Sequence, residues 1–219
     1  MTILEAIQNR HSVRAYKNEP ISADVREKLD AEVCRINEEG NLHISIHYDD
    51  PDGFGSKLAH YGSFRNVNNY IVLAGTGDDD FDLRCGYYGE RLVIYAQQLG
   101  LNTCWAALTY NKKKVKELLL PGETLCMVIA LGYGETQGNP HKGKSFSDVT
   151  AKGEYPQWFI DGVEAALLAP TAVNQQKFMF SMDRDKAVLK IKGLGTCLKT
   201  DLGIIKYHFE VVSGHEVLV

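Results

Sequence analysis

Apolar residues recur along the chain with two different spacings, and each spacing predicts a different kind of element. Apolar positions three or four residues apart predict helices, whereas alternation or a short apolar run predicts strands. By this criterion we expect helices over residues 2–9, 22–40, 83–99, 112–120, 156–168 and 197–213. We expect strands over residues 42–48, 70–75, 103–107, 125–132, 178–182 and 187–192, the last two forming a hairpin. Loops are expected over residues 49–68 and 132–149.

Residues typical of helix ends support these boundaries. Thr2 followed by Glu5 is a capping box, in which each residue satisfies a free backbone N–H at the start of a helix. Ser22 is a favoured first residue for the second helix, and Gly40 is a favoured residue at its end.

Helices alternate with few strands, which predicts an α+β fold with a mostly antiparallel central sheet flanked by helices. The pattern restarts after residue 150, so we divide the chain into a first half, residues 1–150, and a second half, residues 151–219. Residues 89–100 and 200–212 are the expected central helices of the two halves, although the sequence contains no exact repeat. The second half is too short for an independent domain, so we expect it to be integral to one core.

The composition restricts the class of protein. The chain has 219 residues, a formal net charge of −4 and 44% hydrophobic residues, as is usual for soluble globular proteins. Its longest apolar run is far shorter than a membrane span, and its first residues lack a signal-peptide pattern. Five scattered cysteines predict reduced thiols in a cytoplasmic protein, and not disulfides or a zinc site. The mildly acidic charge argues against a nucleic-acid partner.

The stretch R-H-S-V-R-A-Y at residues 10–16 concentrates groups that bind anions. Arg10, Ser12 and Arg14 are spaced by two, so in an extended segment their side chains lie on one side. Two guanidinium groups and a hydroxyl then converge on one point, which suits a phosphate. The alternative is a solvated basic loop.

Two further stretches are candidates for a ligand site. Lys142 and Lys144 flank a glycine that lets the backbone bend close to an anion, although charged surface loops are common. Thr171, Asn174 and Gln176 lie in A-P-T-A-V-N-Q-Q after a predicted helix and offer uncharged hydrogen-bonding groups. These groups suit a polar, planar ligand. The alternative is a turn in which they act as local caps.

These stretches together resemble motifs of the FMN-dependent nitroreductase superfamily. N-R-H-S-V-R-A-Y with a following proline is similar to the family's N-terminal signature, and A-P-T-A-V-N-Q-Q to its A-P-S-x-x-N-x-Q-P-W element. N-P-H-K-G-K-S-F-S-D-V resembles its C-terminal basic stretch, and L-G-L-N-T-C-W and V-I-A-L-G-Y also follow its pattern. The resemblance covers most of the chain and implies a nitroreductase-like fold.

The chain departs from the family pattern in two ways. The A-P-S-x-x-N element usually lies near position 40 and completes the flavin site of a partner subunit, whereas here it lies at residues 169–176. The chain therefore resembles a divergent branch, related to the flavin-fragmenting one, with a second half fused behind the first. This implies a pseudo-two-fold arrangement and favours a monomeric pseudo-dimer, with a homodimer as the alternative. Lys177 and Phe178 replace the family's Pro-Trp, which puts the shape of the substrate pocket in doubt.

The resemblance implies an FMN site built from both halves. Arg10, Ser12 and Arg14 would hold the phosphate and ribityl chain, His11 would lie beside the ring or ribityl, and two lysines would close on the phosphate. The segment after Trp105 would present backbone N–H groups to flavin N5, and the second half would supply further contacts. The cofactor-binding residues expected in this way are Arg10, His11, Ser12, Arg14, Tyr61, Ser63, Ala106, Ala107, Leu108, Lys142, Lys144, Pro170, Thr171, Ala172, Asn174 and Gln176.

The resemblance implies an FMN-dependent oxidoreductase that takes hydride from NAD(P)H and passes two electrons to a nitroaromatic, quinone or similar small-molecule acceptor. The flavin would carry the chemistry, so no protein nucleophile or acid–base pair is expected. Two alternatives stay open: oxygen-dependent flavin fragmentation, and a non-catalytic flavin-binding or redox-sensing protein. The sequence lacks the G-x-G-x-x-G fingerprint and does not distinguish NADH from NADPH.

Other polar residues are given structural interpretations. His43 and His47 lie on one face of a predicted strand, and we take them as its exposed polar side and not as metal ligands. We interpret Glu90 and Asp201, in the two predicted central helices, as ordinary helix-surface or capping carboxylates.

Overall fold

The computed structural model describes residues 1–56, 62–140 and 142–219. Its larger sheet has four strands in the order β1-β2-β4-β3, and every neighbouring pair is antiparallel. The strands of this sheet are β1 (His43–His47), β2 (Asn69–Gly75), β3 (Asn102–Ala106) and β4 (Thr124–Gly132). The predicted antiparallel sheet is therefore confirmed.

Helices of the first half begin close to the residues that the sequence indicates. The predicted ones are α1 (Ile3–Asn9), α2 (Ala23–Gly40), α4 (Phe81–Gln98) and α5 (Lys112–Lys116), and a short 3-10 helix, η1, spans Pro51–Gly53. Thr2 and Glu5 form the capping box at the start of α1. At the end of α2 the left-handed residue is Asn41, with φ of 47°, while Gly40 is still helical. Asparagine tolerates this conformation better than most residues do.

The second half forms a smaller sheet with its own helices. β5 (Phe178–Asp183) and β6 (Lys186–Ile191) form the predicted hairpin, and β7 (Val217–Leu218) adds a parallel strand beside β6. The helices are α7 (Gln157–Leu167) and α8 (Leu198–Ser213), with the 3-10 helix η2 (Ala172–Asn174) between α7 and β5. The order helix, hairpin-paired strands, helix thus occurs twice, as α2-β1-β2-α4 and as α7-β5-β6-α8.

The sequence did not predict one α-helix and one strand of the described residues, nor the short 3-10 helices η1 and η2. The helix α6 (Phe146–Val149) lies within the expected loop 132–149 because Ser145 and Asp148 form a capping box there. The strand β7 is only two residues long and is defined by its pairing with β6, so no local pattern announces it.

The larger sheet is covered on both faces. Ile71 and Leu73 on β2 pack in a cluster with apolar residues of α2 and α4. Tyr70 and Val72, which point to the opposite face, pack with residues of the N-terminal segment and of the loop before β2. Both faces of β2 are therefore buried, in agreement with its continuous apolar run.

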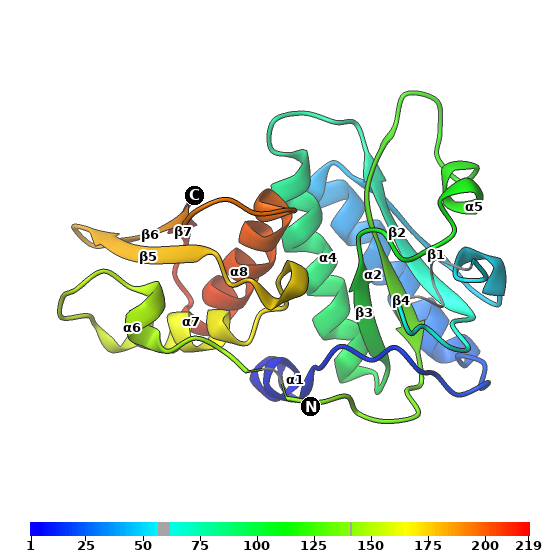
Figure 1. The fold of residues 1–219 in the computed structure, drawn as a ribbon, viewed down its shortest axis with the longest axis horizontal. Helices are drawn as coiled ribbons and strands as arrows, with labels where there is room; N and C mark the ends of the chain where they lie inside the picture. The colour runs from blue at the N-terminus through cyan, green and yellow to red at the C-terminus, as the bar shows by residue number, and fades with distance from the viewer. Residues whose placement is uncertain (57–61, 141) are drawn as a thin grey trace.

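The helices α4 and α8 lie side by side in the middle of the molecule, with the two sheets toward opposite ends (Figure 1). The two helix backbones approach closely at Gly86 and Gly203. A Cβ atom on Gly203 would lie 2.0 Å from the carbonyl oxygen of Leu83, and one on Gly86 would lie 2.1 Å from that of Thr200. The close packing of the two halves therefore requires glycine at both positions.

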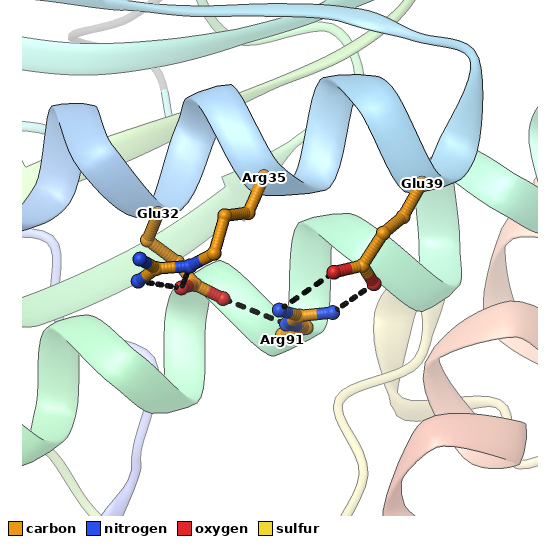
Figure 2. A network of polar contacts seen from close by, with 4 residues as sticks. All are labelled: Glu32, Arg35, Glu39 and Arg91. Carbon is orange, nitrogen blue, oxygen red and sulfur yellow. Dashed lines mark hydrogen bonds and ion pairs between the residues drawn. The ribbon is translucent and has the colours of Figure 1, made fainter.

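A network of ion pairs ties α2 to α4 (Figure 2). The Glu32 carboxylate is nearly buried, and one of its oxygens accepts a hydrogen bond of 2.7 Å from Nε of Arg91. Its other oxygen accepts from Arg35, one turn away. Arg91 also binds Glu39 on α2, so this one guanidinium bridges two carboxylates of the facing helix.

Replacing Arg91 should therefore destabilise the protein more than replacing Arg35. Arg91→Ala leaves the buried Glu32 carboxylate with one exposed partner, and we expect the free energy of unfolding to fall by about 1–3 kcal/mol. Arg35→Ala removes a side chain that is 55% exposed and should cost less than about 1 kcal/mol. Urea unfolding of both variants measures this difference, and equal losses would contradict the assignment.

Candidate functional site

The principal cavity lies where three segments meet. They are the extended N-terminal arm (residues 10–16), the end of β3 and the loop after α7 (residues 168–177). The volume of the cavity is about 530 Å³, within the range of about 300–1,000 Å³ that is usual for small-molecule and cofactor sites. The described residues that line it are Arg10, His11, Ser12, Arg14, Phe64, Trp105, Ala106, Ala107, Leu108, Thr109, Met127, Asn139, Pro170, Thr171, Ala172, Val173, Asn174, Thr196, Cys197, Asp201 and Ile204.

The N-terminal arm is held beside β3 by backbone contacts. The N–H of Val13 donates to the carbonyl oxygen of Thr103 at 3.0 Å, and Ser12 forms a parallel bridge with the same residue. Arg10, Ser12 and Arg14 all line the cavity, as their alternate spacing predicts for an extended segment.

Arg10 differs from Arg14 in its degree of burial. Arg10 is 4% exposed, whereas Arg14 is exposed. One terminal nitrogen of Arg10 donates to the carbonyl oxygen of Leu168 at 3.3 Å, and its Nε has no hydrogen-bond partner among the described residues. Burial lowers the pKa of Arg10, while the nearby Glu90 carboxylate opposes that shift.

The loop after α7 has an unusual backbone. Val173 and Asn174 in η2, and Gln176 just after it, have φ values of 46°, 53° and 42°. This conformation is strained for a β-branched residue, and Val173 is also 93% exposed at the cavity. Side chains hold the loop in place: Thr171 Oγ1 accepts from the N–H of Gln176, and Asn174 donates to the carbonyl oxygen of Lys142.

Asp201 on α8 anchors this loop, and its interpretation as an ordinary surface or capping carboxylate is wrong. It is 5% exposed, and its two oxygens accept from the N–H of Ala172 at 3.0 and 3.2 Å. One of them also accepts from Gln175 Nε2 at 2.7 Å. Burial raises the pKa of Asp201 to about 6, although the bonds from Gln175 and Ala172 favour the charged form.

This shift predicts a pH dependence of stability. The folded protein holds the Asp201 proton more tightly than the unfolded chain does, so this group's contribution to stability falls as pH rises from about 4 to about 6. The shift is worth about 2–3 kcal/mol. The free energy of unfolding of ligand-free Asp201→Asn, measured relative to wild type, should therefore rise by about 2–3 kcal/mol between pH about 4 and about 6 and stay constant above that.

Urea unfolding at a series of pH values measures this gain. Asp183→Asn, at the exposed end of β5, is the control for a general effect of removing an acidic group. Parallel stability curves for Asp201→Asn and wild type would contradict the prediction.

Glu90 on α4 is also buried, so its interpretation as an ordinary helix-surface or capping carboxylate is wrong as well. It is 0% exposed. One carboxylate oxygen accepts from the indole Nε1 of Trp105 at 2.9 Å, and the other lies 2.9 Å from Nε2 of the buried His208. Gly89, next to it, leaves room for the Trp105 ring, because a Cβ there would lie 2.6 Å from that ring.

The structure brings most of the expected contact residues to the cavity but leaves some outside it. Those that line it are Arg10, His11, Ser12, Arg14, Ala106, Ala107, Leu108, Pro170, Thr171, Ala172 and Asn174. Ser63, Lys142, Lys144 and Gln176 are not among its lining residues, and Tyr61 lies outside the described residues.

The placement of Lys144 and Gln176 has a clear physical reason. Gln176 is buried, its Nε2 donates to the carbonyl oxygen of Leu167, and its Oε1 accepts from the N–H of Lys144. The ammonium group of Lys144 donates to the backbone oxygen of Gln176. These groups fasten the loop and face one another, so neither side chain reaches the cavity.

Several cavity residues carried no sequence signal strong enough to select them. Trp105 and Asp201 line the cavity, and their partners come from other elements. Val173 lies inside the stretch A-P-T-A-V-N-Q-Q, which the sequence analysis selected. Its left-handed backbone could not be predicted from the sequence, because it arises only in the folded loop. The spacing of Glu90 did hold a signal, because Gly86 and Val93 share its helical face and are buried.

The histidines set aside as strand-surface residues have structural partners. His43 Nδ1 lies 2.7 Å from Glu123, and His47 stacks on Tyr70. No group of metal-binding side chains large enough to hold an ion occurs in the described part of the chain. None of the described helices is long and apolar enough to cross a membrane.

Comparison with protein families identifies the chain. Residues 2–213 match the family model described as "Putative TM nitroreductase". The chain therefore belongs to this nitroreductase family, and the resemblance to the FMN-dependent nitroreductase superfamily is confirmed. Membership makes it an oxidoreductase by class. No curated protein sequence matches the chain.

Solved structures agree with this fold. A "putative nitroreductase" from Thermotoga maritima has a TM-score of 0.70 and 22% identity, covering 96% of this chain and 83% of that one. A "putative nitroreductase in complex with FMN" from Desulfovibrio desulfuricans has a TM-score of 0.55 and 16% identity, covering 71% and 99%. A "Putative NADH dehydrogenase/NAD(P)H nitroreductase" from Parabacteroides distasonis has a TM-score of 0.53 and 23% identity, covering 69% and 98%. The nitroreductase-like α+β fold is confirmed.

Proposed function

We propose that the cavity binds FMN, and that the protein is an FMN-dependent oxidoreductase. It would take hydride from NAD(P)H and pass two electrons to a nitroaromatic, a quinone or a similar acceptor. The observation that carries the proposal is the Arg10 guanidinium, a nearly buried cation that lines the cavity beside Ser12 and Arg14. Membership of the nitroreductase family supports it, as does the FMN bound by the similar Desulfovibrio protein.

The residues present fit a phosphate-bearing flavin. Arg10 is a nearly buried cation at the cavity wall, and a phosphate oxygen would give its guanidinium a charge-assisted hydrogen bond. Ser12 and Arg14 lie on the same arm and line the same cavity. Asp201 is the carboxylate among the described lining residues, and it is engaged by the loop after α7. The cavity wall therefore favours an anion, without help from Lys142 or Lys144.

The protein's own part in the reaction is binding and placement. Bound FMN would supply the chemistry, accepting hydride from a reduced nicotinamide and giving electrons to the acceptor. Arg10, Ser12 and Arg14 would fix the phosphate end. Trp105 and the loop after α7, which both line the cavity, would help to exclude water from the ring. The cavity, which residues of both halves line, would admit nicotinamide and acceptor in turn.

The visible spectrum of the purified protein, followed by anaerobic mixing with NADH or NADPH, tests this function. We expect a flavin spectrum whose blue band bleaches and returns when an acceptor is added. A flavin that keeps its colour would instead indicate a binding or redox-sensing protein. Loss of flavin on aeration with a new benzimidazole product would indicate flavin fragmentation. A protein that takes up no FMN would overturn the proposal.

The role of Arg10 can be measured separately. Arg10→Ala should weaken FMN binding about tenfold to a hundredfold, because it removes a charge-assisted contact to the phosphate. The affinity for riboflavin, which lacks the phosphate, should change little. Lys142→Ala is the matched control, since this lysine does not line the cavity and its loss should leave FMN affinity unchanged. Equal losses of FMN and riboflavin affinity in Arg10→Ala would contradict the assignment.

A further inference from the structure

The two central helices share a buried ionisable pair that flavin binding does not use directly. Glu90 on α4 and His208 on α8 are both 0% exposed, and His208 Nε2 lies 2.9 Å from Glu90 Oε1. The other ring nitrogen, Nδ1, lies 3.0 Å from the carbonyl oxygen of Ala165 near the end of α7. The pair therefore joins the two halves at their centre.

The partners of His208 determine where its protons lie. A carbonyl oxygen only accepts, so Nδ1 must carry a hydrogen and donate to Ala165. Nε2 faces a carboxylate oxygen at hydrogen-bond distance, so one proton must also lie between these two atoms. With that proton, Glu90 and His208 together carry no net charge. The negative charge of Glu90 is thus compensated within the interface of α4 and α8.

This compensation matters because Arg10 is close by. Arg10 Nε forms a buried ion pair with Glu90 Oε1 at 3.7 Å, a distance too long for a hydrogen bond. The other oxygen of Glu90 is held by Trp105, and the oxygen nearest Arg10 is held by His208. Both oxygens therefore have committed partners. The guanidinium remains at the cavity wall with its Nε unbonded.

We infer that His208 is a positioning residue for the cavity's anion site. By bonding to Glu90, it keeps that carboxylate from drawing the Arg10 guanidinium out of its long ion pair into a direct hydrogen bond, and so leaves the guanidinium placed for a phosphate group. The identity of the anion as the phosphate of FMN rests on the proposed function. The second half would then control the first half's arginine through an interhelical contact outside the cavity.

Binding measurements on two variants test this inference. In His208→Leu, Glu90 loses its donor, Arg10 should move to it, and FMN affinity should fall about tenfold to a hundredfold. Riboflavin affinity should stay near the wild-type value, because that ligand has no phosphate. Adding Glu90→Gln to His208→Leu removes the competing charge and should restore most of the FMN affinity. Glu90→Gln alone is the matched control, and its FMN affinity should stay near the wild-type value. The glutamine amide can still accept from Trp105 and donate to His208.

A measurement without flavin separates this inference from the proposed function. In ¹H–¹⁵N spectra of the ligand-free protein, the Arg10 Nε–H signal, assigned by its loss in Arg10→Lys, should shift in His208→Leu and return in the double variant. An unmoved signal would overturn the inference. Equal losses of FMN and riboflavin affinity, or no rescue by Glu90→Gln, would also overturn it. Wild-type protein that binds no FMN would overturn the proposed function, and the Arg10 signal would still decide the inference.

Discussion

Gly203→Ala is expected to lower the free energy of unfolding by about 3 kcal/mol or more, or to prevent folding. The added Cβ would lie 2.0 Å from the carbonyl oxygen of Leu83 and 2.7 Å from the amide nitrogen of Tyr87, both backbone atoms of α4. Backbone atoms cannot rotate away, so the helices must separate. That cost exceeds the gain of about 1 kcal/mol that alanine usually brings to a helix.

Gly153→Ala provides the matched control for Gly203→Ala. A Cβ on Gly153 would meet the Tyr155 ring at 3.6 Å, an ordinary contact, so its stability should be nearly that of wild type. Urea unfolding compares the two variants. A Gly203→Ala protein as stable as Gly153→Ala would show that α4 and α8 do not pack as closely as described.

A chain that ends at Thr150 is expected to be insoluble, or to fold without binding flavin. Removing residues 151–219 leaves Glu90 without His208 and Arg10 without the Leu168 carbonyl oxygen. It also removes the loop wall of the cavity and uncovers the face of α4 that packs on α8. Residues 151–219 would thus be part of one core and not a detachable domain.

Solubility and FMN titration of the shortened chain measure this result. Co-expression of residues 1–150 with residues 151–219 is the control, because it should restore soluble protein if the two parts still associate. Normal FMN binding by residues 1–150 alone would mean that the first half forms the flavin site unaided.

Local patterns predicted the elements of the fold well. The capping box at Thr2 and Glu5, the alternation in β1 and the apolar runs of β2 and β4 each encode an element in consecutive residues. β7 escaped prediction because its pairing with a distant strand defines it. The short helix α6 depends on the cap formed by Ser145 and Asp148 within a segment that otherwise resembles a loop.

The candidate site was predictable where one segment carries several of its groups. Arg10, Ser12 and Arg14 reach one cavity because the arm is extended, which their spacing already suggested. Glu90 and Asp201 were misjudged because a carboxylate on a helix appears exposed until the partner helix or loop is known. Their partners lie 118 and 29 residues away along the chain. The spacing of Glu90 with Gly86 and Val93 indicated burial, but no local pattern identifies a partner that far along the chain.

Contacts between residues far apart in the sequence can form only late in synthesis, because the chain is made from its N-terminus. Arg10 and Leu168, whose hydrogen bond joins the N-terminal arm to the loop after α7, are 158 residues apart, so this contact cannot form until that loop has left the ribosome. Domains generally fold in the order in which they are made, but here the first half must wait for α8 to cover α4. Until then the buried face of α4 is open to chaperones and to other nascent chains. Cofactor loading is therefore expected only after α8 has been synthesised and has packed on α4.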